Sequence, residues 1–189
     1  MDFKEFSFSP DIRVCIYHVG NENLAYHRHT HISDITYCAA GQLMLEIPAL
    51  SMSYIMHPGQ FIQVPYDMVH RVSHCSPQTE QSSYVLVQIG QFSIDFVHDE
   101  GIVYGQNPRD LGATKLDYSI GSTRERLMSI ARQLTEDRPA KLSDWEYDSI
   151  LSALRTVCKD GIARPLDKDV LLEQLNAIGA NGAEPLRVT

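Results

Sequence analysis

Four potential metal ligands spread over 44 residues constrain the fold of this chain more than any other feature. His27, His29, Asp34 and His70 supply three imidazole rings and one carboxylate. Such side chains suit a divalent first-row metal. Glycine and proline interrupt the same stretch at points where strands should turn. The four side chains can therefore meet only if distant strands come together, as they do in a small β-barrel.

Residues 1–100 have the pattern of short strands separated by turn residues, which is typical of a sandwich or barrel. Side chains alternate between the two faces of a strand, so His27 and His29 point to the same side. Asp34 can return to that side across a bend. The strands that this pattern predicts cover residues 13–18, 34–40, 42–47, 53–56, 60–64, 69–74 and 84–89.

The pattern changes near residue 100, because all eight histidines lie before residue 99. Ser122 or Thr123 is a suitable cap for a helix whose apolar residues recur at helical spacing. The segment 143–146 (Ser-Asp-Trp-Glu) is a capping box that starts a second helix, which ends near Gly161. A short polar link between the two predicts an antiparallel helical hairpin. A third helix is expected over residues 167–178.

Composition excludes several classes of function. The formal net charge of −8 opposes nucleic-acid binding by the chain itself, because phosphate contacts need a basic face. The N-terminus lacks the basic start and apolar run of a signal peptide. No apolar run approaches the roughly 20 residues that cross a bilayer. Four scattered cysteines indicate reduced thiols. We therefore expect a cytoplasmic protein with no membrane association.

Two motifs resemble those of the cupin superfamily. The first consists of His27, one residue, His29, four residues, Asp34, six residues and Gly41. Asp34 stands where the superfamily usually has a glutamate, and it is one methylene shorter. His31 repeats the His-x-His spacing with His29, so it is an alternative ligand.

The second motif consists of Gly59, five residues, Pro65, one residue, Asp67, two residues and His70. Asp67 replaces the usual turn glycine, and aspartate tolerates a positive φ better than most residues. The resemblance covers roughly residues 20–90. It implies a double-stranded β-helix jelly roll over residues 1–100, mainly β, followed by the helical hairpin.

The resemblance also implies the contents of the site. His27, His29, Asp34 and His70 would bind one divalent ion of Fe, Mn, Ni or Zn, although many cupins lack a metal and bind an organic ligand instead. Residues that share the inward face or lie near the barrel mouth would complete a small-molecule site. With His27 and His29, these ligand-binding residues are expected to be Thr36, Cys38, Gln63 and Arg71.

A cupin barrel followed by a helical hairpin resembles the N-terminal half of AraC-type transcription regulators. There the barrel binds a small-molecule effector and the hairpin dimerises. Residues 101–161 would then form a homodimer, and Leu154→Asp should weaken it. Residues 162–189 resemble a linker and the first helix of the helix-turn-helix domain, with Pro185-Leu186 opening the next helix. DNA would be contacted only through that missing domain.

The first functional hypothesis is therefore a small-molecule-sensing and dimerisation domain of an AraC-type regulator. The alternative is a metal-dependent cupin enzyme of the dioxygenase or isomerase type, in which the metal acts as a Lewis acid or activates O2. A binding cupin without chemistry is a third possibility. The sequence has no nucleophile elbow and no phosphate-binding loop, so nothing supports nucleophilic catalysis.

Overall fold

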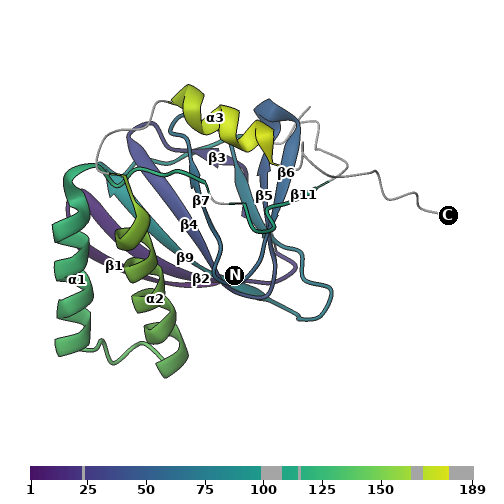
Figure 1. Ribbon diagram of the computed structural model, residues 1–189. Helices are drawn as coiled ribbons and strands as arrows, with labels where there is room; N and C mark the ends of the chain where they lie inside the picture. The colour runs from purple at the N-terminus through teal and green to yellow at the C-terminus, as the bar shows by residue number, and fades with distance from the viewer. Residues whose placement is uncertain (23, 99–107, 115, 163–167, 179–189) are drawn as a thin grey trace.

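The computed structural model describes residues 1–22, 24–98, 108–114, 116–162 and 168–178 of the chain. Its described part is mainly β, with two principal sheets and three α-helices (Figure 1). The first sheet has five strands, all paired antiparallel. In spatial order they are β1 (Asp2–Ser9), β2 (Ile12–Val19), β9 (Ser82–Gly90), β4 (Ile32–Ala40) and β7 (Phe61–Val64).

The second sheet has four strands, and the described residues also form a separate two-stranded pair. Its order is β11 (Arg109–Asp110), β6 (Met52–Met56), β5 (Leu43–Ile47) and β8 (Arg71–His74), with β11 parallel to β6. The separate pair is β10 (Asp95–Phe96) with β3 (His27–Arg28), and a 3-10 turn (Pro48–Leu50) joins β5 to β6. From β4 to β9 the chain passes repeatedly between the two principal sheets, as in a double-stranded β-helix.

All seven predicted strands are present, with ends shifted by at most two residues. A buried apolar cluster with members from both principal sheets fills the interior. Strand β11 joins the second sheet after residue 100, so the barrel extends beyond the boundary predicted from composition.

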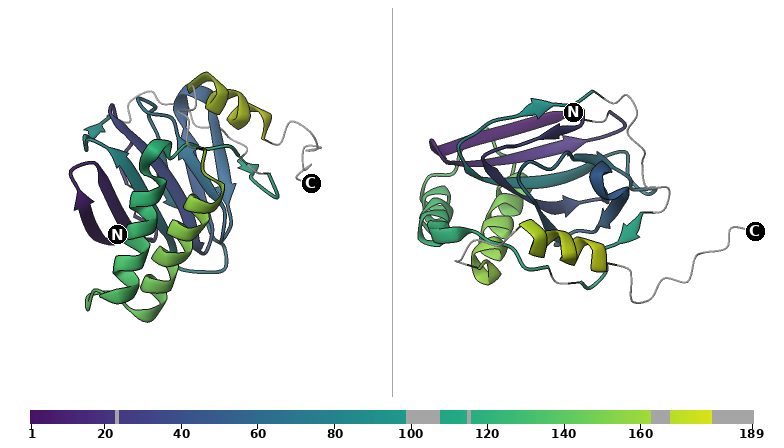
Figure 2. Two further views of the ribbon diagram at one scale, coloured as in Figure 1. Left: turned by 60° about the vertical axis from the view of Figure 1, so that its left-hand side comes forward. Right: turned by 90° about the horizontal axis from the view of Figure 1, so that it is seen from above.

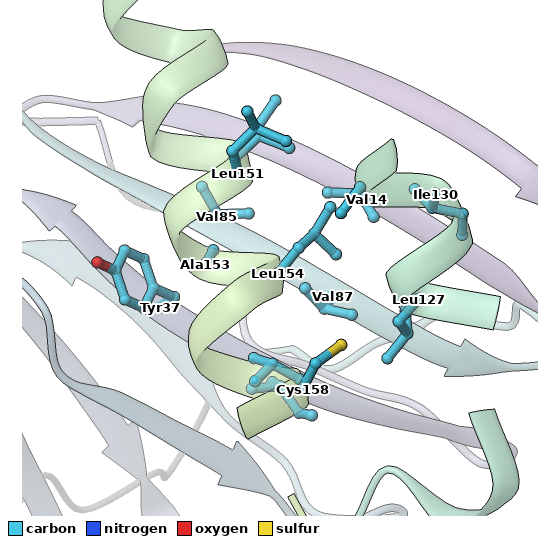
Figure 3. Packing of buried hydrophobic residues seen from close by; sticks show 14 of the residues in the cluster. Val14, Tyr37, Val85, Val87, Leu127, Ile130, Leu151, Ala153, Leu154 and Cys158 are labelled. Carbon is cyan, nitrogen blue, oxygen red and sulfur yellow. The ribbon is translucent and has the colours of Figure 1, made fainter. Parts of the chain in front are cut away.

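Helices α1 (Arg124–Glu136) and α2 (Asp144–Asp160) lie side by side against the outer face of the five-stranded sheet (Figures 1 and 2). A 3-10 turn (Gly121–Thr123) precedes α1, and Thr123 makes no side-chain cap to it. Figure 3 shows Leu127 and Ile130 of α1 and Leu154 of α2 over the sheet residues Val14 and Val87. Burial of this apolar face, rather than helix propensity, stabilises the pair.

The apolar stripe that we expected to form a dimer interface is used inside the chain. Leu154 is completely buried, and Ile150, Leu151 and Val157 share its cluster with the sheet. Leu154→Asp is therefore expected to disrupt the fold of this chain, and not only a dimer as the sequence suggested. The periodicity predicted an apolar face, and that face packs on β2, β4 and β9.

Helix α3 (Lys168–Ala177) packs on the side of the second sheet (Figure 2). Leu175 and Ile178 join the cluster between the two sheets, and Arg109 donates to the carbonyl oxygens of Asn176 and Ile178 at 2.7 Å each. Residues 183–186, which carry the rest of the resemblance to a helix-turn-helix domain, lie outside the described residues. No helix in the described part of the chain has the length and apolarity needed to cross a membrane.

Left-handed backbone conformations occur where the two motifs require turns. Gly41 and Gly59 have φ values of 70° and 89°, and Asp67 has 58°. A Cβ at Gly41 would collide with Ser82, so this turn needs a glycine for space as well as conformation. The prediction that Asp67 takes the place of the turn glycine is confirmed. Its amide donates to the carbonyl oxygen of His29 at 2.6 Å, which connects the second motif to the first.

The predicted capping box at the start of α2 is confirmed, and it also binds the N-terminal strand. Ser143 and Glu146 exchange both hydrogen bonds of the box. Glu146 is buried and accepts hydrogen bonds from Lys4 of β1 at 2.6 Å and from His18 of β2 at 3.0 Å. Burial alone would raise its pKa, but these donors outweigh burial and lower the pKa of Glu146 from 4.5 to about 2.

Glu146→Gln is expected to flatten the acid side of the stability curve. Because the pKa is depressed in the folded state, the stabilisation is complete above pH 4.5 and is lost as the pH falls toward 2. Since Lys4 is partly exposed and solvent screens its charge, we expect a contribution of about 1–3 kcal/mol at pH 7. Urea unfolding at several pH values measures it. Glu136→Gln, at an exposed position of α1, is the control. Equal acid slopes in wild type and Glu146→Gln would contradict this assignment.

Candidate metal centre

Four side chains from separate parts of the sequence converge at one end of the barrel interior. One ligand atom from each of His27, His29, Asp34 and His70 lies within 4.8 Å of all the others. The four residues are only 2–6% exposed. The prediction that these residues come together is confirmed, and three imidazoles with one carboxylate form a suitable ligand set for a divalent metal.

Backbone hydrogen bonds join the two motifs directly. The amide of His27 donates to the carbonyl oxygen of His70 at 3.1 Å, and the amide of His70 donates back at 2.9 Å. The two residues thus form an antiparallel bridge between segments that are 43 positions apart. This pairing does not depend on either side chain, so it places the imidazoles together before any ion binds.

Each histidine of the site has a carbonyl oxygen next to its Nδ1 atom. The Nδ1 atoms lie 3.0 Å from the carbonyl oxygen of Ala25 for His27, 2.5 Å from that of Ser93 for His29, and 2.9 Å from that of Met68 for His70. A carbonyl can only accept, so Nδ1 carries the proton in each ring. In the neutral form of each ring Nε2 then has a lone pair, which is the tautomer that binds a metal.

The carboxylate of Asp34 is oriented by a buried amide. Gln88 of β9 donates to Oδ1 of Asp34 at 2.8 Å. Oδ2 lies 2.9 Å from Nε2 of His29 and 3.7 Å from Nε2 of His70. Both Oδ2 of Asp34 and Nε2 of His29 are nevertheless buried without a hydrogen bond of good geometry. Two such atoms at one point fit a site whose ligand is a cation.

Electrostatics in the cluster favour an ionised Asp34 carboxylate and a neutral His27 ring. Burial, with the nearby His70, lowers the pKa of His27 to about 4. Burial also acts against ionised His29, but Asp34 outweighs it and raises the pKa of His29. For Asp34 burial favours the neutral acid, and the two neighbouring histidines outweigh it and lower the pKa. The cluster therefore offers an anionic oxygen from Asp34 and a neutral nitrogen from His27, and the proton that Asp34 favours on His29 is one that a bound cation would replace.

The sequence left two questions about the ligands open, and the positions of His31 and Asp34 in the structure answer both. His31 is exposed and is absent from the cluster, so it does not replace His29. Asp34 reaches the cluster although it is one methylene shorter than glutamate, because β4 begins at Ile32 and brings its backbone close. The shorter carboxylate is compatible with the site.

A cavity of about 810 Å³ adjoins the four ligands and is lined by inward-facing residues of β1, β2, β4 and β9. Thr36, which we predicted to contact a ligand, is on its wall. The other polar residues that line it include Glu5, Arg13 and Gln88, and most of the remaining wall is apolar or aromatic. A volume of this size accommodates a small organic molecule beside the metal ligands.

Three residues predicted to contact a ligand do not line this cavity. Cys38 has the same strand parity as Asp34 and Thr36, but it is covered completely by the core between the sheets. Gln63 pairs with Ile35, which faces α1 and α2, and its amide bonds to the backbone of Ser119. Arg71 binds Glu46 at 2.7 Å, on the face of β8 opposite the cavity-lining Val72. Gln63 and Arg71 therefore lie on the strand faces that point away from the cavity.

Sequence reasoning missed the residues that complete the wall. Gln88 was within a predicted strand, but nothing in its sequence context marks it as the partner of Asp34. Arg13 and Tyr17 lie on the same face of β2, and Phe92 follows β9. Strand β1 lines the cavity with Phe3 and Glu5 but was not predicted, because neither of its faces is buried clearly enough to give a strict alternation.

The strand order and the buried cluster define a double-stranded β-helix, or jelly-roll, protein with a candidate metal centre. No protein-family model and no curated protein matches the sequence. Similar solved structures include a protein with a double-stranded β-helix domain from Klebsiella pneumoniae, at 17% identity and a TM-score of 0.43, covering 48% of this chain and 78% of that one.

Two further similar structures are enzymes by name. The polyketide cyclase RemF from Streptomyces resistomycificus has 17% identity and a TM-score of 0.42, with 51% of this chain and 68% of that one covered. The DMSP lyase DddQ from Ruegeria pomeroyi has 14% identity and a TM-score of 0.42, with 52% and 53% covered. The matched part is about half of this chain.

Proposed function

We propose that this chain is a cupin-type, metal-dependent enzyme that acts on a small organic molecule in the cavity beside His27, His29, Asp34 and His70. One observation carries the proposal: each imidazole binds a carbonyl through Nδ1 and leaves Nε2 for a cation. A cavity that bound only an organic ligand would not need three imidazoles fixed in this tautomer. For the reaction we propose the dioxygenase or isomerase type that the sequence resemblance implies.

When bound, a divalent ion of Fe, Mn, Ni or Zn would supply Lewis-acid or O2 chemistry at its open positions. The residues of the chain have separate tasks. Asp34 contributes the negative charge that offsets the cation, and Gln88 fixes the direction of its carboxylate. Val72 and Leu86 form apolar wall beside the ligands. Such walls exclude water and strengthen the electrostatic interactions of a bound substrate.

A sensor domain of an AraC-type regulator is the second candidate, and the contacts of β1 favour it. This strand lines the cavity with Glu5, while its Lys4 binds Glu146 at the start of α2. Lys141, just before α2, donates to the backbone of Glu5 at 2.9 Å. A ligand that moved β1 would therefore act on α2 as well.

The sensor candidate has further consequences. A cytoplasmic homodimer formed by these helices would have to use their outward face, where Met128 is exposed, because the inward stripe is occupied. DNA binding would require a domain beyond the helices. In this reading an effector would bind without being consumed.

Metal analysis of the purified protein tests the proposal. We expect one divalent ion per chain, or one equivalent of Co²⁺ taken up by the metal-free protein with a change in its visible spectrum. Folded protein that contains no metal and binds none would refute the metal centre. With metal bound, consumption of an organic ligand supports the enzyme. Binding without consumption, accompanied by a change of oligomeric state, supports the sensor.

A further inference from the structure

Aromatic walls of the cavity start at the metal ligands and continue to its mouth. The ring of Phe92 lies 6.2 Å from that of His29, and the ring of Phe96 lies 6.3 Å from that of His27. Phe92 is 44% exposed and Phe96 is 61% exposed, whereas the histidines are buried. The two rings therefore stand between the metal ligands and the solvent.

These two rings are placed by the same contacts that orient the histidines. Phe96 is in β10, which pairs with β3 so that Phe96 is opposite His27. Ser93, next to Phe92, provides the carbonyl oxygen at Nδ1 of His29. The aromatic rings are thus part of the support of the metal site. Polar side chains would be more favourable than phenylalanine at positions so exposed to solvent. Binding of a ligand beside the candidate metal site would explain why phenylalanines are found there.

A ladder of three stacked rings forms another part of the wall. Phe3 of β1 stacks on Tyr17 of β2 with ring centroids 5.2 Å apart, and Tyr17 stacks on Tyr84 of β9 at 4.8 Å. The interplanar angles are 15° and 10°. The ladder runs from the half-exposed Phe3 to the buried Tyr84. The rings stack on one another, so it is their edges that line the cavity, and an aromatic ligand gains edge-to-face contacts with them.

The charges around the cavity favour one negative charge on the ligand. Arg13 lies over the ring of Phe92 at 3.7 Å and binds Glu5 at 2.5 Å, so this pair is neutral overall. A divalent ion with Asp34 has a net charge of one positive unit. A monoanion therefore neutralises the loaded site, and its oxygen atoms are the groups that would meet the cation.

Building on the proposed function, we infer that the ligand is a flat aromatic monoanion of the aryl carboxylate class. Its carboxylate faces the metal, and the ring lies among Phe92, Phe96 and the Phe3–Tyr17–Tyr84 ladder. The exposed rings at the mouth allow the aromatic body to extend beyond a single ring. Arg13 and Glu5 flank the ligand as a polar pair.

The test compares two acids with the same donors. Salicylate and cis-2-hydroxycyclohexanecarboxylate both carry a hydroxyl next to a carboxylate, but only salicylate is flat and aromatic. Calorimetry and the visible spectrum of the Co²⁺-loaded protein measure both affinities. We expect salicylate to bind roughly two- to tenfold more tightly, the range expected for aromatic pairing. Equal affinities, or tighter binding of the saturated acid, would overturn the aromatic class.

Two variants assign the preference to the wall. Phe92→Leu keeps an apolar side chain but removes the ring, and we expect it to reduce the preference for salicylate about threefold. Tyr66→Leu changes a similarly exposed aromatic residue that does not line the cavity, and the preference should not change. An unchanged preference in Phe92→Leu would contradict the inference. The Co²⁺ titration without any acid precedes both, so failure of the metal centre is seen separately.

Discussion

Replacing His70 with alanine is expected to weaken Co²⁺ binding by about 100-fold or more, because even indirect partners of metal ligands change affinity by about 10- to 100-fold. The backbone bridge between His27 and His70 uses only amides and carbonyls, so the variant should keep its fold. Titration of metal-free protein with Co²⁺, followed by the visible spectrum, measures the affinity. Turnover of any compound that the wild-type protein consumes should be lost together with metal binding.

His31→Ala is the matched control for this variant. It also removes an imidazole, here from within the first motif, but His31 is exposed and lies outside the cluster. Its affinity for Co²⁺ should equal that of the wild type. Circular dichroism establishes that both variants are folded. Unaltered one-to-one binding by His70→Ala would show that the cluster is not the metal site, whatever its geometry.

The fold was predictable where burial gives an element a clear sequence pattern. The buried strand β9 and the helix α2 have clear patterns, and the capping box at Ser143 marks the start of α2 within one residue. Strands β3, β10 and β11 have only two residues each, too few for any periodicity. They form because neighbouring strands supply their hydrogen bonds. This pairing depends on the tertiary structure and is not visible in the local sequence.

The site was predictable to the extent that motif spacing determines which side chains converge. Spacing placed the four ligands, and local turn chemistry explained Asp67. It did not place Gln63 and Arg71, because a parity argument across separate strands fails with a shift of one residue. It also did not indicate Gln88 or Phe92, whose roles depend on which strand neighbours which.

The second large effect concerns the face that α2 presents to the sheet. Leu154→Asp is expected to unfold the protein, because it places a carboxylate in a cluster whose buried members are hydrophobic. Leu154 has no exposed surface, so the charge cannot reach water without opening the contact between α2 and the sheet. The cost should exceed about 4 kcal/mol, a large part of the 5–15 kcal/mol typical of a whole domain.

The opposite result would change the interpretation of the helices. If α2 were an intermolecular surface, Leu154→Asp would yield a folded monomer from a wild-type dimer, as the sequence pattern first suggested. Thermal unfolding by circular dichroism, combined with sedimentation, separates these outcomes. Leu154→Ala should remain folded with a loss of about 2–5 kcal/mol. Arg155→Asp, at the next and exposed position of α2, should cost no more than about 0.5 kcal/mol. The contrast between adjacent positions arises because the helices belong to the core of this chain, and any dimer must use the surface that they leave uncovered.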